Sequence, residues 1–350
     1  MTGVVPPPVG PPWQRALRGR LDELVIDSVA LRGNALGDPA VRPLWVYSPP
    51  GQDETAPLPV IYLIQAFTGQ VDMWRNHRAY RPSVIELIDE LFSDATVPRC
   101  LVAMVDCWTR LGGSQFVDSP ATGRYHTYLC EEVVPFVDAH YRTIAHRDHR
   151  AITGHSSGGY GAMITPMLRP DLFGALATHA GDALFELCYW KDVPVVVRTL
   201  RDSYGGSYED FLSDVRTRPM MTRAGDAELM GMWAMAAAYS ADADGTVNLP
   251  FDIASGRMIA EVWERWLAWD PVRMVPAHAD ALRSLRAIYI DAGTRDEYHL
   301  DLGAAAFRDA LVAIGVRDVF FELFPAGHGG TEYRHPIAMR YLAEHIAPAR

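Results

Sequence analysis

Three residues that lie far apart in the chain have the types and settings that nucleophilic catalysis needs. Ser156 is the centre of GHSSG, residues 154–158, while Asp296 and His328 each follow a strand-like run in the last quarter of the chain. A serine hydroxyl is a weak nucleophile, so it needs a base to take its proton and a third group to orient that base. Together, the three side chains have the chemistry to attack an ester carbonyl.

The residues around Ser156 predict a nucleophile elbow, a strained turn from a strand into a helix that exposes the serine. The apolar pair 151–152 comes before the turn as part of a buried strand, and a helix-like stretch follows it. Two positions before and after the serine, a side chain would crowd the backbone, and Gly154 and Gly158 remove that conflict. Ser157 is a rival nucleophile, but the two glycines are spaced evenly about Ser156 and not about Ser157.

Candidates for the acid and the base follow in the chain order known for such elbows. His328 lies in a glycine-rich loop after the strand-like run 319–324, and catalytic groups collect at the carboxyl ends of strands. Asp296 lies in the turn after the run 287–291, from which a carboxylate can reach across to the histidine loop. Asp291, which ends that run, is the rival acid, but a residue still in the sheet is less well placed.

Attack by the serine creates a negatively charged oxygen that preorganised N–H groups must stabilise. One expected donor is the backbone N–H of Ser157, the residue after the nucleophile. The other is expected from the loop after the run 59–65, where Phe67 is best placed. Both donors act through the backbone, so this role constrains their side chains little.

The elements that must position these groups alternate between strands and helices, which predicts an α/β fold with a mostly parallel sheet. Apolar runs predict strands at 24–31, 41–47, 59–65, 101–105, 175–179, 287–291 and 319–324. Helical periodicity appears at 83–92, with Ser83 as N-cap, and at 126–140, 300–314 and 336–345. The alternation breaks in a tryptophan-rich stretch with helix-like runs at 227–238 and 257–269. We therefore expect a proline-rich arm at 1–20, a core at 21–182 and 277–350, and a helical cap inserted at 183–276.

The composition is that of a globular protein and excludes several classes of partner. Of 350 residues, 49% are hydrophobic and 21% charged, and the net charge of −11 with no basic patch argues against nucleic acid and anionic membranes. No apolar run approaches the length of a membrane-spanning helix, and the proline-containing start does not have the pattern of a secretory signal. The four cysteines make no C-x-x-C pair, so we expect reduced thiols, a cytoplasmic protein, and neither a metal nor an organic cofactor.

Five stretches carry a resemblance to a known family: 113–125 (GSQFVDSPATGRY), 150–163 (RAITGHSSGGYGAM), 169–182 (RPDLFGALATHAGD), 291–300 (DAGTRDEYHL) and 324–330 (FPAGHGG). In these stretches the chain resembles the putative esterase (esterase D-like) family of the α/β-hydrolase superfamily. That family includes S-formylglutathione hydrolases, feruloyl and acetyl xylan esterases, enterochelin esterases and mycolyltransferases. The resemblance implies the α/β-hydrolase fold, with Ser156 as nucleophile, Asp296 as acid and His328 as base.

Two departures from the family pattern bear on substrate identity. Relatives usually carry His-Gly after the third strand, where this chain has Gln65-Ala66, so the oxyanion loop is expected to be shaped differently. Many relatives also carry an aromatic residue soon after the catalytic histidine, where this chain has Gly329-Gly330-Thr331.

Substrate contacts are expected from the long loop after 101–105, through Trp108 and Gln115, and from the cap, through Trp190 and Trp233. The many aromatic and methionine residues of the cap indicate a small-molecule ester that is partly apolar. For any single cap residue, however, ordinary packing against the sheet is the better explanation, because large apolar residues are mostly buried for packing.

Three functions are compatible with these residues. The first is a serine esterase that forms an acyl-enzyme on Ser156, with His328 as general base and acid and Asp296 orienting it. The second is an acyltransferase with the same triad and an alcohol acceptor in place of water. The third is a catalytically silent binding protein of the same fold, which the three filled triad positions disfavour. Self-association into a homo-oligomer is compatible with each.

Overall fold

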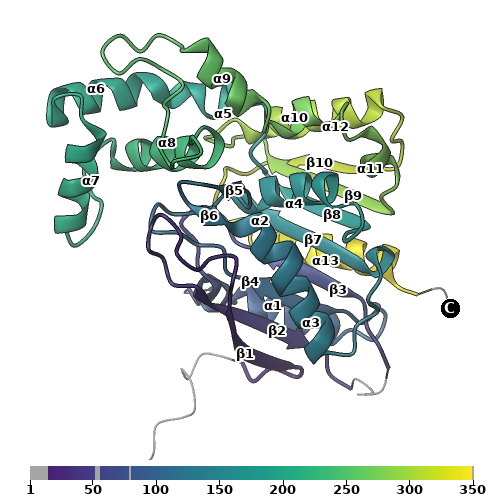
Figure 1. Cartoon of the computed structure of the whole chain (residues 1–350). Coiled ribbons are helices and arrows are strands. Elements are labelled where there is room, and N and C mark those ends of the chain that lie inside the picture. Colours follow the sequence, from purple (N-terminus) through teal and green to yellow (C-terminus); the bar gives the residue numbers. More distant parts are fainter. Residues whose placement is uncertain (1–14, 52–55, 79, 349–350) are drawn as a thin grey trace, which may run out of the picture.

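The computed structural model describes residues 15–51, 56–78 and 80–348, and within them the strands form one large sheet and one short hairpin (Figure 1). The large sheet has eight strands in the order β1-β2-β4-β3-β7-β8-β9-β10. Their bounds are β1 Arg20–Asp27, β2 Val41–Ser48, β3 Val60–Ile64, β4 Leu101–Val105, β7 Arg150–His155, β8 Ala175–His179, β9 Ala287–Gly293 and β10 Phe320–Phe324. β2 is antiparallel to both of its neighbours, and the pairs from β4 to β10 are parallel. The prediction of a mostly parallel sheet is confirmed.

Two sets of helices cover the two faces of the sheet (Figure 1). Their bounds are α1 Val84–Phe92, α3 Val134–His140, α4 Ser157–Leu168, α12 Leu300–Ala313 and α13 Arg334–Ile346. Along β3, Ile61 and Leu63 face the core with α1 and α13. Its other three residues, Val60, Tyr62 and Ile64, face the core with α3, α4 and α12. Burial on both faces explains why such strands read as nearly continuous apolar runs.

Helix α1 begins where the sequence predicts. The Ser83 side chain accepts a hydrogen bond from the Glu86 amide at 3.3 Å, and the Glu86 carboxylate accepts one from the Ser83 amide at 2.7 Å. This capping box satisfies two backbone donors that the first helical turn leaves without partners. The predicted proline-rich arm lies mostly outside the described residues, and Arg15 begins the part that is described.

The first strand differs from the prediction of 24–31. β1 pairs with β2 in a register that runs from Arg20 opposite Ser48 to Asp27 opposite Val41, so the strand lies four residues nearer the amino end. Its bounds are set by this partner and not by its own apolar residues, because antiparallel strands end together. The loop after β4 also contains a hairpin that the sequence did not indicate, β5 Asp118–Ser119 and β6 Gly123–Arg124.

The predicted helix 126–140 is interrupted by a wider turn. It consists of α2 Tyr125–Thr127, a π-helical segment Tyr128–Val133 and then α3. Pro135 has no N–H to donate to the carbonyl four residues earlier, and the π-helical segment lies directly before it. A proline near the middle of a helical pattern thus changes the hydrogen bonding without ending the helix.

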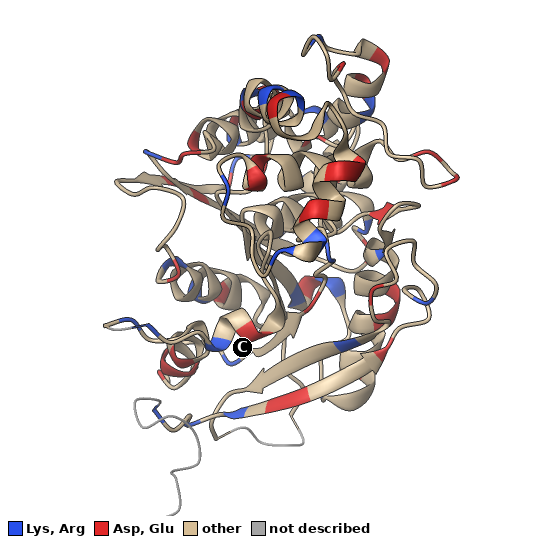
Figure 2. Cartoon of the chain, turned by 90° about the vertical axis from the view of Figure 1, so that its left-hand side faces the viewer, with Lys and Arg blue, Asp and Glu red and all other residues tan. Residues whose placement is uncertain are grey.

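The segment between β8 and β9 is helical in the structure and carries the outermost helices (Figure 1). Its helices are α5 Phe185–Cys188, α6 Val193–Tyr204, α7 Tyr208–Thr217, α8 Asp226–Tyr239, α9 Ala260–Leu267, α10 Pro271–Met274 and α11 Ala279–Arg283, with a 3-10 turn at Trp190–Asp192. α9 starts three residues later than predicted, because Phe251 and Met258 form an isolated antiparallel bridge before it. Acidic and basic residues are interleaved along the elements rather than separated (Figure 2). Within the described residues, every helix falls short of the length and hydropathy that a bilayer-spanning helix needs.

Candidate active site

Ser156 occupies a strained turn between β7 and α4. Its φ of 57° and ψ of −124° are backbone angles that residues other than glycine rarely adopt. A Cβ on Gly154 would lie 2.5 Å from the backbone of Gly158, and a Cβ on Gly158 would lie 2.6 Å from the carbonyl oxygen of Ile64. The amide of Ser156 donates to the carbonyl of His179 on the next strand at 2.9 Å. The turn therefore has the geometry of a nucleophile elbow, and both glycines are needed for it.

His328 and Asp296 are in direct contact. The Nδ1 atom of His328 lies 2.7 Å from Oδ2 of Asp296, whose side chain is fully buried, while the His328 side chain is 16% exposed. A carboxylate can only accept a hydrogen bond, so Nδ1 of His328 carries a proton. In the neutral imidazole, Nε2 then keeps its lone pair. Burial raises the pKa of Asp296, but the hydrogen bond and the charge of His328, with the Tyr298 amide, outweigh it and hold the pKa below its usual value.

Parallel strands bring these two loops together. β9 and β10 are neighbours, and Asp296 and His328 come from the loops at their carboxyl ends. A Cβ on Gly293 would lie 2.5 Å from the Ala326 carbonyl oxygen, so the two loops touch at their start. The Glu297 carboxylate then accepts the His328 amide at 2.8 Å. The position of the imidazole is therefore fixed by bonds to backbone and side chain alike.

The residue before the serine connects the elbow to the histidine loop. The ring of His155 lies 4.4 Å from the ring of His328, and its Nε2 is 3.0 Å from the His328 carbonyl oxygen. Burial, then the charges of His328 and His179, lowers the pKa of His155 to about 3, so it is neutral and Nε2–H is the donor. No hydrogen bond joins Ser156 and His328 among the described residues, and such bonds are often long until substrate binds.

Asp291, the rival acid, has other partners. Its Oδ1 lies 2.6 Å from Nδ1 of His179, and its Oδ2 accepts hydrogen bonds from Arg334 at 2.8 Å and Tyr289 at 2.9 Å. All three partners are side chains. Asp291 therefore belongs to a buried polar cluster under the histidine loop.

A cluster of three histidines, of which His179 and His335 are buried, was not anticipated. The sequence predicts that histidines other than His328 solvate the surface or cap helices, as His146 does by accepting from an amide of a short turn. His155, His179 and His335 are instead packed together beneath the site, with the rings of His179 and His335 4.8 Å apart. They come from β7, β8 and α13, so only the fold reveals their proximity.

The two expected oxyanion donors lie on adjacent segments. Ser157 is the first residue of α4, and the amides of a first helical turn have no partner within the helix. Phe67 follows β3, whose end contacts the elbow through Gly158. In the orientation that satisfies its hydrogen bonds, the Gln65 side chain donates to Val105 and accepts from the amides of residues 107 and 108, each at 2.8 Å. Gln65 therefore ties this loop to the end of β4.

A buried polar cluster lies beside Ser157. The Asp182 carboxylate accepts hydrogen bonds from Ser157 Oγ at 3.2 Å, Gln115 Nε2 at 3.1 Å and Tyr189 OH at 2.8 Å. Gln115 also donates to Tyr239 at 3.1 Å, so this predicted substrate contact does lie next to the elbow. Burial raises the pKa of Asp182, although these hydrogen bonds oppose the shift. Asp182 itself was not singled out, since only the folded chain places it there.

Among the described residues, the three predicted tryptophan contacts make no hydrogen bond or ring contact with Ser156, Asp296 or His328. Trp190 packs against Trp263 with ring centroids 5.1 Å apart, and Trp233 packs against Tyr208 at 4.7 Å. Both pairs lie within the cap, as ordinary packing predicts. The carbonyl of Trp108 accepts hydrogen bonds from other parts of the core, and its side chain has no hydrogen bond or ring contact with a site residue in the described part of the chain.

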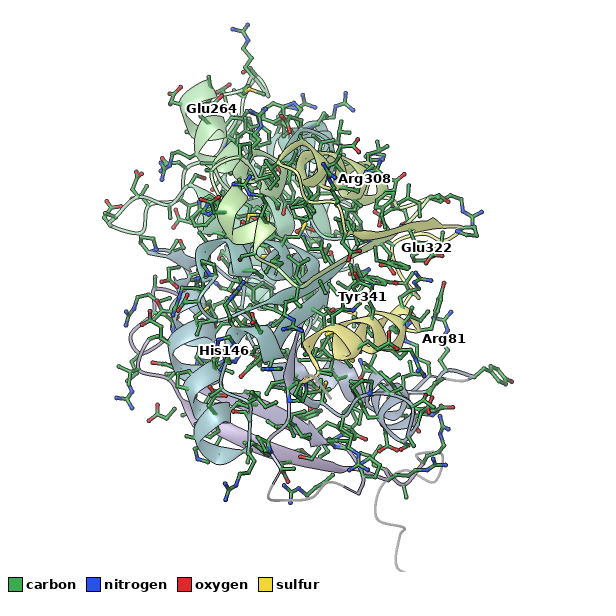
Figure 3. All side chains as sticks on the ribbon, turned by 90° about the vertical axis from the view of Figure 1, so that its right-hand side faces the viewer. Arg81, His146, Glu264, Arg308, Glu322 and Tyr341 are labelled. Carbon is green, nitrogen blue, oxygen red and sulfur yellow. The ribbon has the colours of Figure 1, made fainter. Side chains whose placement is uncertain are left out.

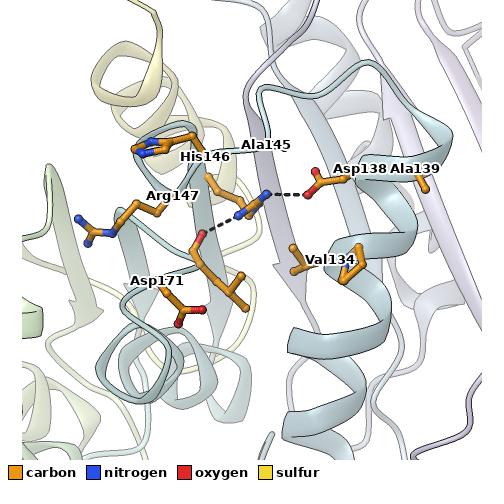
Figure 4. A pocket seen from close by; sticks show the side chains of 10 residues that line it. Val134, Asp138, Ala139, Ala145, His146, Arg147 and Asp171 are labelled. Carbon is orange, nitrogen blue, oxygen red and sulfur yellow. Dashed lines mark hydrogen bonds and ion pairs between the residues drawn. The ribbon is translucent and has the colours of Figure 1, made fainter.

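A separate hollow of about 640 Å³ lies at the opposite edge of the sheet (Figure 4). It surrounds Arg150, the first residue of β7, whereas Ser156 follows the last residue of that strand. Arg150 is paired with Asp138 at 2.7 Å and donates to the Leu172 carbonyl at 3.0 Å (Figure 4). Its charge is already satisfied, and the length of a strand separates this hollow from the elbow.

Comparison with known proteins agrees with this geometry. A ferulic acid esterase structure has a TM-score of 0.60 at 19% identity, covering 95% of this chain and 99% of that one. The S-formylglutathione hydrolase from Agrobacterium tumefaciens has a TM-score of 0.54 at 17% identity, covering 95% and 98%. The fluorophosphonate-binding serine hydrolase F of Staphylococcus aureus has a TM-score of 0.56 at 15% identity, covering 95% and 99%. At these identities the likeness concerns the fold, which is that of the α/β-hydrolases. A family model described as "Putative esterase" matches residues 39–313, more than half of the chain, and the protein therefore belongs to the putative esterase family.

Proposed function

We propose that the protein is a serine hydrolase that cleaves carboxylic esters through an acyl-enzyme on Ser156. His328 acts as general base and acid, Asp296 orients its imidazole, and the amides of Phe67 and Ser157 stabilise the oxyanion. The observation that carries this proposal is the 2.7 Å contact between His328 Nδ1 and Asp296, because it leaves Nε2 as the free base. Membership in an esterase family supports the same reaction class.

The proposed reaction has two steps that balance in protons. Ser156 Oγ attacks the ester carbonyl while His328 Nε2 takes the hydroxyl proton, and the carbonyl oxygen becomes an oxyanion between the two amides. The oxyanion collapses, the bond to the alcohol oxygen breaks, and His328 gives its proton to that oxygen. Water then attacks the acyl-enzyme with His328 again as base, which releases the acid and restores Ser156.

The hydrogen bonds of Asp296 favour this cycle. Its pKa is held below the usual value, so the carboxylate is ionised at neutral pH and can stabilise the imidazolium that forms during each step. The amino end of α4 adds a favourable partial positive charge where the oxyanion develops.

The test is hydrolysis of p-nitrophenyl esters of increasing acyl length, together with labelling by a fluorophosphonate. Wild type is expected to turn over and to be labelled at Ser156, and Ser156→Ala to lose both. Ser157→Ala is a matched control that should still be labelled at Ser156, because the proposed role of residue 157 uses only its backbone amide. Labelling at Ser157 in the wild type, or equal turnover by wild type and Ser156→Ala, would contradict the proposal.

A further inference from the structure

A cavity of about 500 Å³ borders the candidate site on the side of the histidine loop. Three of its lining residues are direct chain neighbours of site residues: Ala66 lies next to the proposed oxyanion donor, His155 next to the serine, and Gly329 next to the base. Its volume lies within the range of small-molecule sites, roughly 300–1,000 Å³. The cavity therefore has the size and the position to hold one half of a substrate.

The floor of the cavity is largely apolar. Trp74, Val84 and Leu87 line it, and all come from the segment between β3 and β4. His335 also lines it, with its ring 5.6 Å from that of Trp74 and with no hydrogen-bond partner for Nδ1 in the described structure. Such a floor suits an aromatic or alkyl group and offers one polar ring.

Two arginines lie at this cavity without any counter-ion. In the described residues, the guanidinium groups of Arg78 and Arg81 make no ion pair and no hydrogen bond, although both residues line the cavity. A terminal nitrogen of Arg81 lies 3.1 Å from where a Cβ on Gly330 would be, so it reaches the loop that follows His328. Arg81 belongs to the sheet half of the molecule, far from Glu264 of the cap (Figure 3).

The charge of this lining is opposite in sign to that of the whole chain. Glu332 is the one carboxylate among the described lining residues and pairs with neither Arg78 nor Arg81, so the lining carries one net positive charge, whereas the chain carries a net charge of −11. Unpaired guanidinium groups beside an apolar floor match a ligand with an apolar body and an anionic group, since arginine binds carboxylates with charge-assisted hydrogen bonds.

We propose that this cavity binds the leaving half of the ester and that Arg78 and Arg81 select a leaving alcohol that carries a carboxylate. The assignment to the leaving half rests on the proposed function, because His328 must give its proton to the leaving oxygen. The leaving half therefore lies beside the histidine loop, and residues 329–333 of that loop line the cavity. The acyl half is then directed to the other side of the elbow, where Gln115 and Asp182 lie.

Matched phenyl esters test the preference. The carboxylate of 3-acetoxybenzoate is on the leaving phenol, methyl 3-acetoxybenzoate is its neutral counterpart, and monophenyl glutarate carries a carboxylate on the acyl half instead. After correction for the alkaline hydrolysis rate of each ester, we expect kcat/KM of the wild type to favour 3-acetoxybenzoate over the neutral ester by about tenfold. Monophenyl glutarate should gain no such advantage over phenyl pentanoate.

Charge variants locate the effect. Arg78→Gln and Arg81→Gln are each expected to lower the ratio of kcat/KM between the anionic and neutral esters by about threefold or more, and Glu332→Gln to raise it. Arg198→Gln makes the same charge change on α6 of the cap and should leave the ratio as it is. An equal fall in Arg198→Gln would show a general charge effect and overturn the assignment to the cavity.

A binding measurement separates this proposal from the proposed function. In Ser156→Ala, calorimetry should detect 3-hydroxybenzoate, the alcohol product, with an affinity that the double change Arg78→Gln and Arg81→Gln weakens by about tenfold. If esters are hydrolysed through Ser156 but neither the kinetic preference nor this weakening appears, the cavity proposal is wrong and the esterase stands. If Ser156 neither turns over esters nor is labelled, the proposed function fails, and the assignment to a leaving half fails with it.

Discussion

Two carboxylates five positions apart, Asp291 and Asp296, have different environments and hence different expected roles. Asp296 lies in the loop after β9 and contacts His328, whose ring lies 4.4 Å from the ring of His155, the residue before the serine. Asp291 remains in the sheet and is held by His179, Tyr289 and Arg334, where it compensates a buried guanidinium. One carboxylate therefore has the contacts of an orienting acid, and the other those of a structural ion pair.

Replacing each of these carboxylates by its amide separates the two roles. Asp296→Asn keeps the shape but no longer favours the Nδ1–H tautomer, so kcat should fall by about 10³- to 10⁴-fold with little change in stability. Asp291→Asn leaves Arg334 without a full counter-charge and should lower the free energy of unfolding by about 3 kcal/mol while kcat falls less than about tenfold. Steady-state kinetics and urea unfolding of both variants measure this, and the reverse pattern would assign the orienting role to Asp291.

Close backbone approaches hold the elements around Ser156 in register. The start of α4 lies directly on the end of β3, since a Cβ on Gly158 would be 2.6 Å from the Ile64 carbonyl oxygen and 2.8 Å from that of Gln65. The chain continues from Gln65 into the loop that carries Phe67. The helix that carries one proposed oxyanion donor thus sets the position of the loop that carries the other.

Gly158→Ala is expected to disturb both donors at once. The added methyl must push β3 and α4 apart, which should cost about 1–3 kcal/mol of stability and lower kcat/KM by about 100-fold through misplacement of the oxyanion loop. Gly231→Ala is the matched control, because nothing lies within 4 Å of a Cβ at that position of α8. There alanine should stabilise the helix by about 0.5–1 kcal/mol. Urea unfolding and ester kinetics compare the two, and retained kcat/KM in Gly158→Ala would refute the coupling.

The sequence predicts a structural element well where the element's own residues determine its bounds, and poorly where contacts with distant segments determine them. Strands such as β3, β4 and β8 are buried on both faces, so their apolar runs alone give their positions within a residue. β1 lies at the edge of the sheet, and its bounds follow the register with β2, which its own residues do not encode. The loops that carry Asp296 and His328 were predictable because chain order and strand ends place them together.

Side-chain clusters formed by distant segments were beyond that reasoning. Asp182 gains its environment from Gln115 and Tyr239, which precede and follow it by dozens of residues. His155 lies opposite His179 through the pairing of β7 with β8, and His335 joins them only when α13 packs across the sheet. Burial is the main cause of the shifted pKa values of these groups, and burial is a property of the assembled fold.

These buried groups give the whole molecule a pH-dependent stability. Burial lowers the pKa of His155 to about 3 and that of His335 well below its usual 6.5, so below pH 6.5 the unfolded chain binds protons that the folded chain does not. Stability from this source is full above pH 6.5 and is lost as the pH falls. Asp182 acts in the opposite direction, since its raised pKa makes the folded chain hold a proton above the usual 3.8. Burial also lowers the pKa of His126 and raises the pKa of Asp270, so three histidines are opposed by two aspartates, and the net slope from these groups is positive.

The free energy of unfolding should therefore rise between pH 4.5 and 6.5. Each histidine that stays neutral in the folded protein adds up to about 1.4 kcal/mol per pH unit to the slope of the unfolding free energy. The full value is reached at the acid end of this range, where the pH is well below the unfolded pKa. His155→Gln keeps a side-chain N–H donor for the His328 carbonyl but cannot take up a proton, so the slope should fall by about that amount. His140→Gln removes an exposed histidine and should leave the slope unchanged. Urea unfolding of the three proteins at several pH values measures these slopes. An equal slope in wild type and His155→Gln would mean that His155 is protonated in the folded protein, which its burial between His328 and His179 argues against.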